Sequence, residues 1–398
     1  MSNKEKDQKT VYTTLADSVA ELSQIILPLG RWYQENKRDL PWRGEKNPYH
    51  TWVSEIMLQQ TRVEAVKEYY TRFLRELPSV RELASCPEDR LMKLWEGLGY
   101  YSRVRNMQKA AIQIMNDFGG KIPEDAGTLK TLPGIGDYTA GAIASIAFDR
   151  PQAAVDGNVL RVLTRLLADS SDISRQKYRR ETEKNLTEAM KQELSGDSCQ
   201  KHVTPGDVNQ GMMDLGAMIC LPNGKPKCPE CPLLKWCRSH EQGRETDFPV
   251  KAEKKPRRTE KRTILLVRDG ERVLLNRRPE KGLLAGMYEF PNLAGTLSEE
   301  EALLRVKEMG ILALHIRKLA DSRHVFSHIE WQMTGYEIRI GDFPDRRSVE
   351  NEESIGHLAE SGLFFAEIGE IRRKYAIPSA YRAYADALSL GLSGVKSH

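Results

Sequence analysis

Apolar residues recur at three- and four-residue steps through the first two thirds of the chain, from about Leu22 to Cys237. The stretch 51–74 shows this spacing, which places its apolar side chains on one face of a helix. Glycine and proline interrupt the pattern near 97–99, 118–123 and 132–136. The pattern therefore predicts an all-α domain of short helices.

The pattern changes after residues 251–262, a stretch with seven basic and two acidic residues and no apolar periodicity. Such a stretch is typical of an exposed linker. Beyond it, two apolar runs flank Asp269-Gly270, a sequence typical of a β-hairpin turn. Alternation from Val325 to Met333 predicts further strand structure, and helical spacing returns at 298–309 and 379–390. The last third is therefore predicted to be a separate α+β domain.

These changes divide the 398 residues into a polar extension at 1–21, an all-α domain at 22–245, a basic linker at 246–262 and an α+β domain at 263–392. No apolar run approaches the roughly 20 residues that a membrane helix needs, and the polar start lacks the apolar core of a secretory signal. We therefore expect a cytoplasmic protein with no membrane partner. The formal net charge of +4 is too small to indicate nucleic acid binding by itself.

Four of the six cysteines lie close together in the sequence, at Cys220, Cys228, Cys231 and Cys237. In a cytosolic chain, this grouping indicates a metal or cluster site rather than disulfides. Four thiolates suit either Zn²⁺ or an iron–sulfur cluster, and spacing alone favours zinc. Cys86 and Cys199 stand apart, and we expect them to be ordinary thiols.

Two carboxylates stand in surroundings that fit acid–base chemistry. Glu55 is a lone acid among mostly uncharged residues of a predicted helix, where burial would raise its pKa. Taken alone, an exposed helix glutamate is the more frequent case. Asp156 directly precedes an apolar helical stripe, which by itself favours the role of a helix N-cap.

The glycines of Leu132-Pro-Gly-Ile-Gly136 join two predicted helices. Gly134 and Gly136 leave backbone N–H groups open to a close ligand, and the second helix begins there with the positive end of its dipole. A phosphate suits that position. A plain turn between two helices explains the same residues equally well.

Three segments together carry a resemblance to a known family: residues 132–136, Val155-Asp-Gly-Asn-Val159 and Asp214-Leu-Gly-Ala-Met-Ile-Cys220. They resemble the helix-hairpin-helix DNA glycosylases of the endonuclease III and MutY type. The resemblance implies that the four cysteines hold one four-iron, four-sulfur cluster instead of zinc, although the first gap is seven residues here and six in the family. It also implies that the glycine hairpin holds the DNA backbone, assisted by a bound monovalent cation.

Breaking an N-glycosidic bond needs a proton on the departing base and negative charge near the sugar. The resemblance implies that Glu55 protonates adenine at N7 and that Asp156 stabilises the cationic sugar, with Asn158 as its supporting partner. Relatives that also cut the strand carry a lysine where this chain has Tyr138. We therefore expect hydrolysis by water, an abasic product, and a role for Tyr138 in shaping the site beside Glu55.

Other site residues are implied by their matching positions in the family. Those resembling its adenine pocket are Trp42, Arg43, Leu58 and Gln210. Those resembling the residues that fill the gap left by a flipped base are Gln60, Thr61 and Tyr100. Each also has an ordinary explanation, such as core packing for Trp42.

The C-terminal domain resembles the Nudix fold without its metal-binding set. Residues 277–291 resemble the strand–turn–strand before the Nudix box, but 303–310 retain a single glutamate, so Mg²⁺-dependent hydrolysis is not expected. MutY-type enzymes use such a domain to inspect 8-oxoguanine, and Phe326-Ser327-His328 matches their recognition loop. A hydroxyl suits a base that has gained an N7 donor and an O8 acceptor. Without the family, a buried Phe and an incidental Ser-His would explain these residues.

The predicted fold is multidomain, with an all-α helix-hairpin-helix glycosylase domain that carries an iron–sulfur loop, followed by an α+β Nudix-like domain. The predicted function is removal of adenine mispaired with 8-oxoguanine or guanine in double-stranded DNA, by a monomer and without strand cleavage. Two alternatives remain open, namely a bifunctional glycosylase with lyase activity and a cluster-bearing DNA sensor without catalysis.

Overall fold

The computed structural model describes residues 18–195, 202–252, 256–340 and 362–390. These fall into two compact units. The helical unit comprises the described parts of Met1–Ser85 and Asn106–Glu253, and the sheet unit those of Cys86–Arg105 and Lys254–His398. Cys199 and most of the predicted N-terminal extension lie outside the described residues. Within them, no helix is both long enough and apolar enough to span a membrane.

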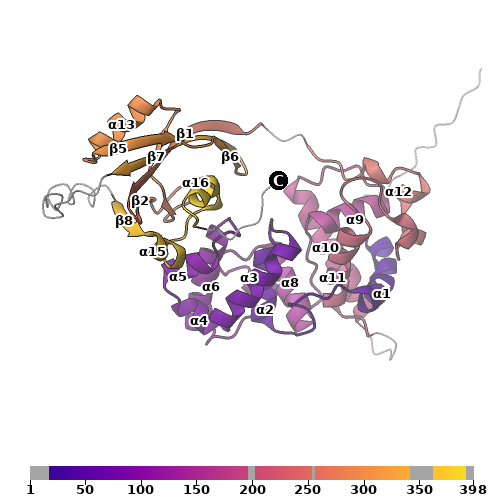
Figure 1. The fold of residues 1–398 in the computed structure, drawn as a ribbon. Coiled ribbons are helices and arrows are strands. Elements are labelled where there is room, and N and C mark those ends of the chain that lie inside the picture. Colours follow the sequence, from indigo (N-terminus) through magenta and orange to yellow (C-terminus); the bar gives the residue numbers. More distant parts are fainter. Residues whose placement is uncertain (1–17, 196–201, 253–255, 341–361, 391–398) are drawn as a thin grey trace, which may run out of the picture. The chain divides into compact units, whose positions relative to one another are not determined.

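The helical unit consists of helices joined by short turns (Figure 1). Their bounds are α1 (Val19–Asn36), α2 (Pro48–Leu58), α3 (Val63–Glu76), α4 (Val80–Ser85), α6 (Ser102–Asp117, which starts in the sheet unit), α7 (Ala126–Leu129), α8 (Asp137–Phe148), α9 (Gly157–Leu167), α10 (Gln176–Leu194), α11 (Pro205–Met218) and α12 (Arg238–Glu241). One core cluster joins apolar faces of α1, α9, α10 and α11, with Leu22, Leu160 and Leu215 fully buried. The prediction of an all-α domain is confirmed.

The apolar spacing across residues 51–74 belongs to two helices rather than one. α2 ends at Leu58 and α3 begins at Val63. Between them, Gln60 adopts a φ of +63°, a left-handed conformation that cannot continue an α-helix. The break leaves Gln60 exposed on a connecting turn.

The predicted glycine hairpin joins α7 to α8. Gly134 has a φ of +79°, and a Cβ added there would lie 2.7 Å from the Cβ of Asn106, so both backbone conformation and space require glycine. Gly136 is the N-cap of α8, and no side chain caps that helix. The first-turn N–H groups of α8 are therefore left without a side-chain acceptor.

Helix α11 occupies a central place in the helical unit, packing against α1, α8 and α9. It begins with a capping box in which Thr204 and Asp207 satisfy each other's backbone N–H groups, and Pro205 occupies the first helical turn. It ends at Met218, just before Cys220. One helix thus leads directly into the cysteine-rich loop.

The sheet unit contains one mixed sheet with helices packed on it (Figure 1). Its elements are α5 (Glu88–Leu94), β1 (Arg258–Asp269), β2 (Arg272–Arg277), β3 (Tyr288–Glu289), β4 (Asn292–Ala294), α13 (Glu299–Glu308), β5 (Ala313–Lys318), β6 (Ser322–Val325), β7 (Ile329–Ile340), β8 (Leu363–Glu367), α15 (Ile368–Arg373) and α16 (Arg382–Ala387). The strand order is β3-β2-β1-β7-β5, while β4 pairs with β1, β6 with β7 and β8 with β2. Two apolar clusters form, one involving α15 and α16 and the other α13. The predicted α+β domain and its Asp269-Gly270 hairpin are confirmed.

The boundary between the parts differs from the predicted one. β1 begins at Arg258, inside the stretch predicted to be linker, because Arg258 and the following residues pair in parallel with β7 from Ile329 onward. The Trp331 indole of β7 also donates to Glu260 at 3.2 Å. The polar residues at the start of β1 thus belong to a strand because they pair with residues that lie far away in the sequence. A pattern of neighbouring residues does not reveal such partners.

Residues 86–105 belong to the sheet unit, although the sequence pattern assigns them to the helical domain. Lys93 of α5 donates to the backbone carbonyls of Ile371 at 3.1 Å and Tyr375 at 3.2 Å. The buried Glu96 carboxylate accepts from the backbone N–H of Ile377 at 2.8 Å and pairs with Lys93 at 2.7 Å. These polar contacts tie α5 to the C-terminal helices.

Substitution of Gly141 by alanine is expected to destabilise the helical unit. Gly141 lies on α8 where an added Cβ would be 2.3 Å from the carbonyl oxygen of Ala153, so the backbone must shift. Overpacking of this kind costs about 1–3 kcal/mol. The midpoint of urea unfolding measures the loss, and Gly157→Ala is the control because an added Cβ there meets nothing within 4 Å. Equal midpoints for the two variants would contradict this packing.

Candidate active site

A buried carboxylate and a tyrosine hydroxyl meet where α2 packs against α8. Glu55 of α2 is 5% exposed, and Tyr138 in the first turn of α8 donates to its Oε2 atom at 2.7 Å. Burial raises the pKa of Glu55 to about 7, against the lowering effects of the Tyr138 hydrogen bond and the Arg43 charge. The negative charge of Asp156 also raises this pKa. Glu55 can therefore hold or release a proton near neutral pH.

Asp156 is the N-cap of α9, as its position in the sequence predicts. One carboxylate oxygen accepts from the backbone N–H groups of Asn158 and Val159, both at 2.8 Å, and the other accepts from the Asn158 side chain at 2.8 Å. Its charge acts on Glu55 and, together with burial, holds the pKa of Tyr138 well above its usual value. The charge of Asp156 therefore reaches both Glu55 and Tyr138, which are joined to each other by a hydrogen bond.

The segment that leads to Asp156 is held by Asn209, a residue the sequence patterns do not single out. Asn209 is fully buried on α11, and its amide donates to Ser145 at 2.7 Å and to the carbonyl of Gln152 at 2.8 Å. Its side-chain oxygen accepts from the backbone N–H of Ala154 at 3.0 Å. These contacts link α8, α11 and the segment before Asp156.

Arg43, predicted to belong to the base pocket, pairs with Asp214 of α11. The Arg43 side chain is 7% exposed and the Asp214 side chain is fully buried. Arg43 donates from both terminal nitrogens, including Nη2 to Oδ1 at 2.9 Å, and Arg38 donates to the same carboxylate. The positive charge of Arg43 lowers the pKa of Glu55.

Apart from Tyr100, the other residues predicted from the adenine pocket and the base gap lie in the helical unit, with different degrees of exposure. Trp42 is buried with its ring edge-on to Tyr70 at 5.4 Å, as a core residue would be. Leu58, Thr61 and Gln210 are half-buried, and Gln60 is exposed. The predicted roles of these residues remain predictions.

In the sheet unit, Tyr100 and the loop between β6 and β7 lie together. The Tyr100 hydroxyl lies 3.2 Å from the Ser327 hydroxyl, and the Tyr100 side chain is half exposed. The Phe326 ring contacts His324 and Trp331 with centroid separations of 4.6 and 4.9 Å. Phe326 thus anchors the loop, while Ser327 and His328 are exposed.

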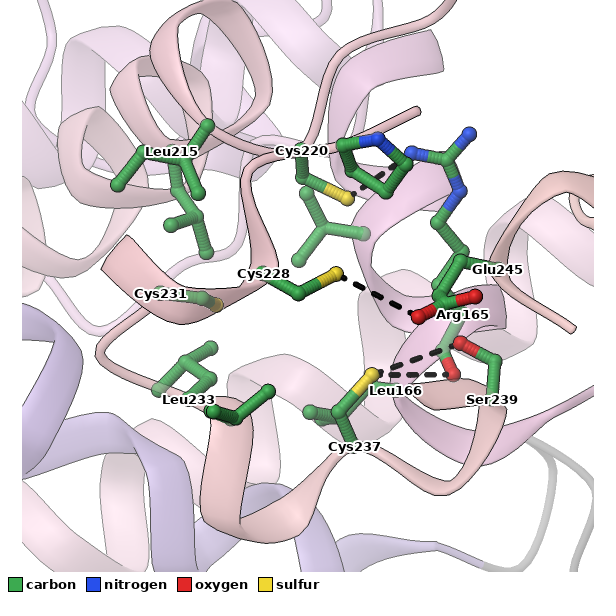
Figure 2. A pocket seen from close by; sticks show the side chains of 14 residues that line it. Arg165, Leu166, Leu215, Cys220, Cys228, Cys231, Leu233, Cys237, Ser239 and Glu245 are labelled. Carbon is green, nitrogen blue, oxygen red and sulfur yellow. Dashed lines mark hydrogen bonds between the residues drawn. The ribbon is translucent and has the colours of Figure 1, made fainter. Parts of the chain in front are cut away.

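The four clustered cysteines line a single cavity (Figure 2). Cys220 follows α11, Cys228 and Cys231 lie at either end of one short turn, and Cys237 precedes α12. Much of the remaining lining is apolar, including Leu166, Leu215 and Leu233. All four sulfur positions predicted from the sequence therefore converge.

The cysteine cavity suits an anionic four-thiolate site. Burial, together with the charges of Glu245, Cys237 and Cys220, raises the pKa of Cys228 to about 11. Burial also raises the pKa of Cys231 to about 12, with contributions from the other three cysteines. Thiolates packed so closely need a cationic partner, and within the described parts of the chain Arg165 donates to just one of the four sulfurs, that of Cys220, at 3.2 Å. The residues present therefore fit a bound metal cluster.

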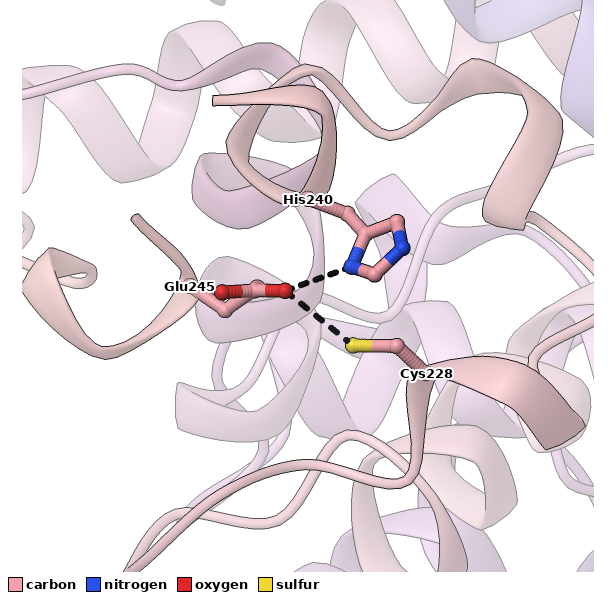
Figure 3. Close-up of side chains that lie close together, drawn as sticks. All are labelled: Cys228, His240 and Glu245. Carbon is pink, nitrogen blue, oxygen red and sulfur yellow. Dashed lines mark hydrogen bonds and ion pairs between the residues drawn. The ribbon is translucent and has the colours of Figure 1, made fainter. Parts of the chain in front are cut away.

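A second group of possible ligands shares one of these cysteines (Figure 3). Ligand atoms of Cys228, His240 and Glu245 lie within 4.8 Å of one another. His240 and Glu245 already pair at 2.5 Å, and Glu245 is 3.7 Å from the Cys228 sulfur. Because Cys228 cannot complete both sets at once, the four-cysteine arrangement is the better supported site.

Comparisons with known proteins match both parts of the chain. Residues 53–188 match the HhH-GPD superfamily of base excision DNA repair proteins, and residues 263–387 match the NUDIX domain. The adenine DNA glycosylase of Mus musculus is 35% identical, covering 83% of this chain and 73% of its own length. The Homo sapiens adenine DNA glycosylase is 36% identical, and the match covers 78% of this chain and 66% of the human protein. Among solved structures, a thermostable thymine-DNA glycosylase matches at 27% identity with a TM-score of 0.47, covering 57% of this chain and all of its own.

Replacing Glu55 by glutamine is expected to stabilise the fold, and more so as the pH rises. The ordinary pKa of 4.5 applies to the unfolded chain and a pKa of about 7 to the folded chain, so the wild type loses stability between those pH values. Glutamine carries no charge to desolvate, and its advantage should grow to about 3 kcal/mol above pH 7.

Urea unfolding of the Glu55→Gln variant and the wild type at pH 5 and pH 8 measures this difference. Glu124→Gln is the control, because Glu124 is exposed and paired only at the surface with Arg150. A stability difference that is the same at both pH values would contradict a raised pKa for Glu55.

Proposed function

We propose that this chain, which belongs to the adenine DNA glycosylase family, removes adenine mispaired with 8-oxoguanine or guanine from double-stranded DNA and leaves an abasic site. As a member of that family, the chain is an N-glycosylase of base excision repair. The observation that most supports the specific proposal is the buried Glu55–Tyr138 hydrogen bond in the electrostatic reach of Asp156.

In the proposed reaction, Glu55 acts as the general acid on an adenine extruded from the duplex. Its pKa of about 7 leaves a large protonated fraction at neutral pH. The Glu55 proton moves to N7 of adenine, the bond from N9 to the sugar breaks, and its electron pair leaves with the base. Tyr138, whose pKa is well above its usual value, stays protonated and stabilises the resulting carboxylate through its hydrogen bond.

Asp156 supplies the second charge that this reaction needs. Loss of adenine leaves positive charge on the sugar, and a carboxylate nearby lowers the energy of that state. Three hydrogen bonds from the start of α9 hold Asp156, so the carboxylate need not reorganise during the reaction. Asn158 supplies two of these hydrogen bonds and is thereby assigned a supporting role. Water then adds to the sugar and gives up a proton to the Glu55 carboxylate, and the abasic site is released.

The identity of residue 138 supports hydrolysis without strand cleavage. Cleaving relatives form a Schiff base through a lysine amine at this position, and a phenol cannot do so. Here the Tyr138 hydroxyl is already committed to Glu55. We therefore propose a monofunctional enzyme, active as a monomer.

The glycine hairpin is proposed to hold the DNA backbone. Gly134 and Gly136 are exposed, and the uncapped first turn of α8 offers N–H groups and the positive end of a helix dipole to a phosphate. A monovalent cation bound at the hairpin would add positive charge there. Such contacts position the duplex without reading its sequence.

The loop of residues 326–328 is proposed to read the base opposite adenine. Phe326 is anchored on Trp331, whereas the Ser327 hydroxyl is exposed and can both donate and accept a hydrogen bond. An 8-oxoguanine differs from guanine by gaining a donor at N7 and an acceptor at O8, which a hydroxyl can distinguish. The contact between Tyr100 and Ser327 links this loop to the residue proposed to enter the base gap.

The four cysteines are proposed to hold a four-iron, four-sulfur cluster. When bound, such a group would join α11, the cysteine loop and α12 covalently and so stabilise the loop next to the DNA. The proposed reaction steps use side chains of this chain and water, and none of them involves the cluster.

One assay tests the proposed reaction. A duplex with an adenine/8-oxoguanine or an adenine/guanine pair is incubated with the protein, and strand breaks are counted with and without hot alkali. We expect breaks only after alkali, and a loss of about 10²–10⁴ in rate for Glu55→Gln because its proton is missing. Breaks without alkali would instead indicate a lyase, and full activity of Glu55→Gln would remove the assigned acid. Binding without any base release would indicate a sensor.

The cluster proposal is tested by metal content and colour. We expect about four iron atoms per chain and absorption in the visible region, because bound Zn²⁺ has a filled d shell and no such absorption. Cys231→Ser should lose this absorption and lower the midpoint of thermal unfolding, whereas Cys86→Ser, at a buried cysteine outside the cavity, should keep the absorption. A colourless wild type containing one zinc would overturn the iron assignment.

A further inference from the structure

Asp214 binds two arginines at the turn that leads from α1 to α2. Its Oδ1 accepts from Arg38 Nε at 2.8 Å and from Arg43 Nη2 at 2.9 Å. Its Oδ2 accepts from the backbone N–H of Arg38 at 3.2 Å and from Arg43 Nη1. A single carboxylate on α11 thus closes the turn that carries Trp42 and Arg43.

This carboxylate is ionised despite its burial. Burial alone would raise the pKa of Asp214, but the hydrogen bonds and charges of Arg43 and Arg38 hold it below its ordinary value. Two parallel hydrogen bonds between a guanidinium and a carboxylate also fix the plane of the guanidinium. A lysine in place of the arginine, or an amide in place of the carboxylate, cannot form this pair of bonds. Asp214 therefore determines both where Arg43 lies and how it is oriented.

The Nε–H donor of Arg43 remains for another partner. Its Nε atom is buried and has no hydrogen-bond acceptor among the described residues. The two terminal nitrogens are taken by Asp214, and the guanidinium lies 5.2 Å from the centre of the Tyr33 ring. A buried donor without an acceptor is destabilising, so an acceptor on a bound molecule would relieve this destabilisation.

We propose that Asp214 is a positioning residue for base removal, which holds the Arg43 guanidinium beside Glu55 with its Nε free to donate to the extruded adenine. The proposal rests on the proposed function, since it assigns a role within that site. Asp214 acts only through Arg43 and touches neither the base nor the sugar. Adenine offers ring-nitrogen acceptors besides N7, and Nε is the donor assigned to one of them.

The charged neighbours of Glu55 determine how replacement of Asp214 should change the pH dependence of the rate. Glu55 faces Tyr138 from α8, Asp156 from the start of α9 and Arg43 from the turn after α1. Of these groups only Arg43 is held by Asp214. Because the Arg43 charge lowers the pKa of Glu55, displacement of Arg43 raises that pKa. Replacing Asp214 must therefore lower the maximal rate of adenine release. It must also move the fall of that rate at alkaline pH, the alkaline limb of the pH–rate profile, to higher pH.

The test is a double-mutant cycle of Asp214→Asn and Arg43→Gln, in single-turnover release of adenine from the adenine/8-oxoguanine duplex across pH 5 to 9. We expect each single variant to lower the rate plateau by at least about tenfold and to move the alkaline limb upward. The double variant should match Arg43→Gln in both measurements. Asp214→Glu, which keeps the carboxylate, should recover part of the plateau.

Asp169→Asn is the matched control. Asp169 is also a buried carboxylate of the helical unit, and it accepts from the Tyr178 hydroxyl at 2.9 Å. Its replacement should lower the midpoint of thermal unfolding and leave the alkaline limb unchanged. Visible absorption of every variant is recorded, because α11 leads into Cys220 and a lost cluster would change the rate by another route.

An Asp214→Asn variant with the wild-type plateau and limb would overturn the proposal. If Asp214→Asn alone does not fold, the double variant, which no longer buries an unpaired Arg43, is compared with Arg43→Gln. Equal plateaus and limbs support the proposal, and a lower plateau in the double variant overturns it. A wild type that releases no adenine would instead reject the proposed function, and that result is separate because it appears before any variant is made.

Discussion

The proposed chemistry of this protein depends on keeping one carboxyl group out of water at the meeting of two helices. Glu55 is almost completely buried, and its pKa of about 7 results from the opposition of burial against a tyrosine hydrogen bond and an arginine charge. Such a group is unfavourable for folding whenever it is ionised. The helices around it must therefore be held by contacts elsewhere, such as those of α8 with α11 and of α2 with α3.

Helix α11 connects the parts of the proposed site. Along its length, Asn209 holds the segment before Asp156, Asp214 holds Arg43, and the chain continues directly into Cys220. Because these groups lie on or directly after one helix with a capping box at its start, their positions relative to one another are fixed by that helix. This arrangement explains why a helix with little amphipathic character is nevertheless buried on several sides.

In the sheet unit, the long strands β1 and β7 support the loop that carries Ser327. β1 and β7 run parallel over their length, and the loop before β7 presents Ser327 beside Tyr100. Residues 86–105 join this unit through Lys93 and Glu96, so a segment from the first half of the chain contributes to the proposed reading of the opposite base. Phe326 and Trp331 stabilise the loop by aromatic contact and leave its hydroxyl exposed.

Local patterns in the sequence were sufficient for the all-α and α+β parts, the Asp269-Gly270 hairpin, the N-cap at Asp156 and the grouping of four cysteines, because each depends on neighbours within a few residues. Tertiary structure alone decided the start of β1, the membership of residues 86–105 in the sheet unit, and the contacts of Asn209 and Asp214. Their partners lie tens to hundreds of residues away, as Arg43 does from Asp214. The pKa of Glu55 belongs to the same class, since burial and charge are properties of the packed structure and the helical pattern around Glu55 is equally compatible with an exposed side chain.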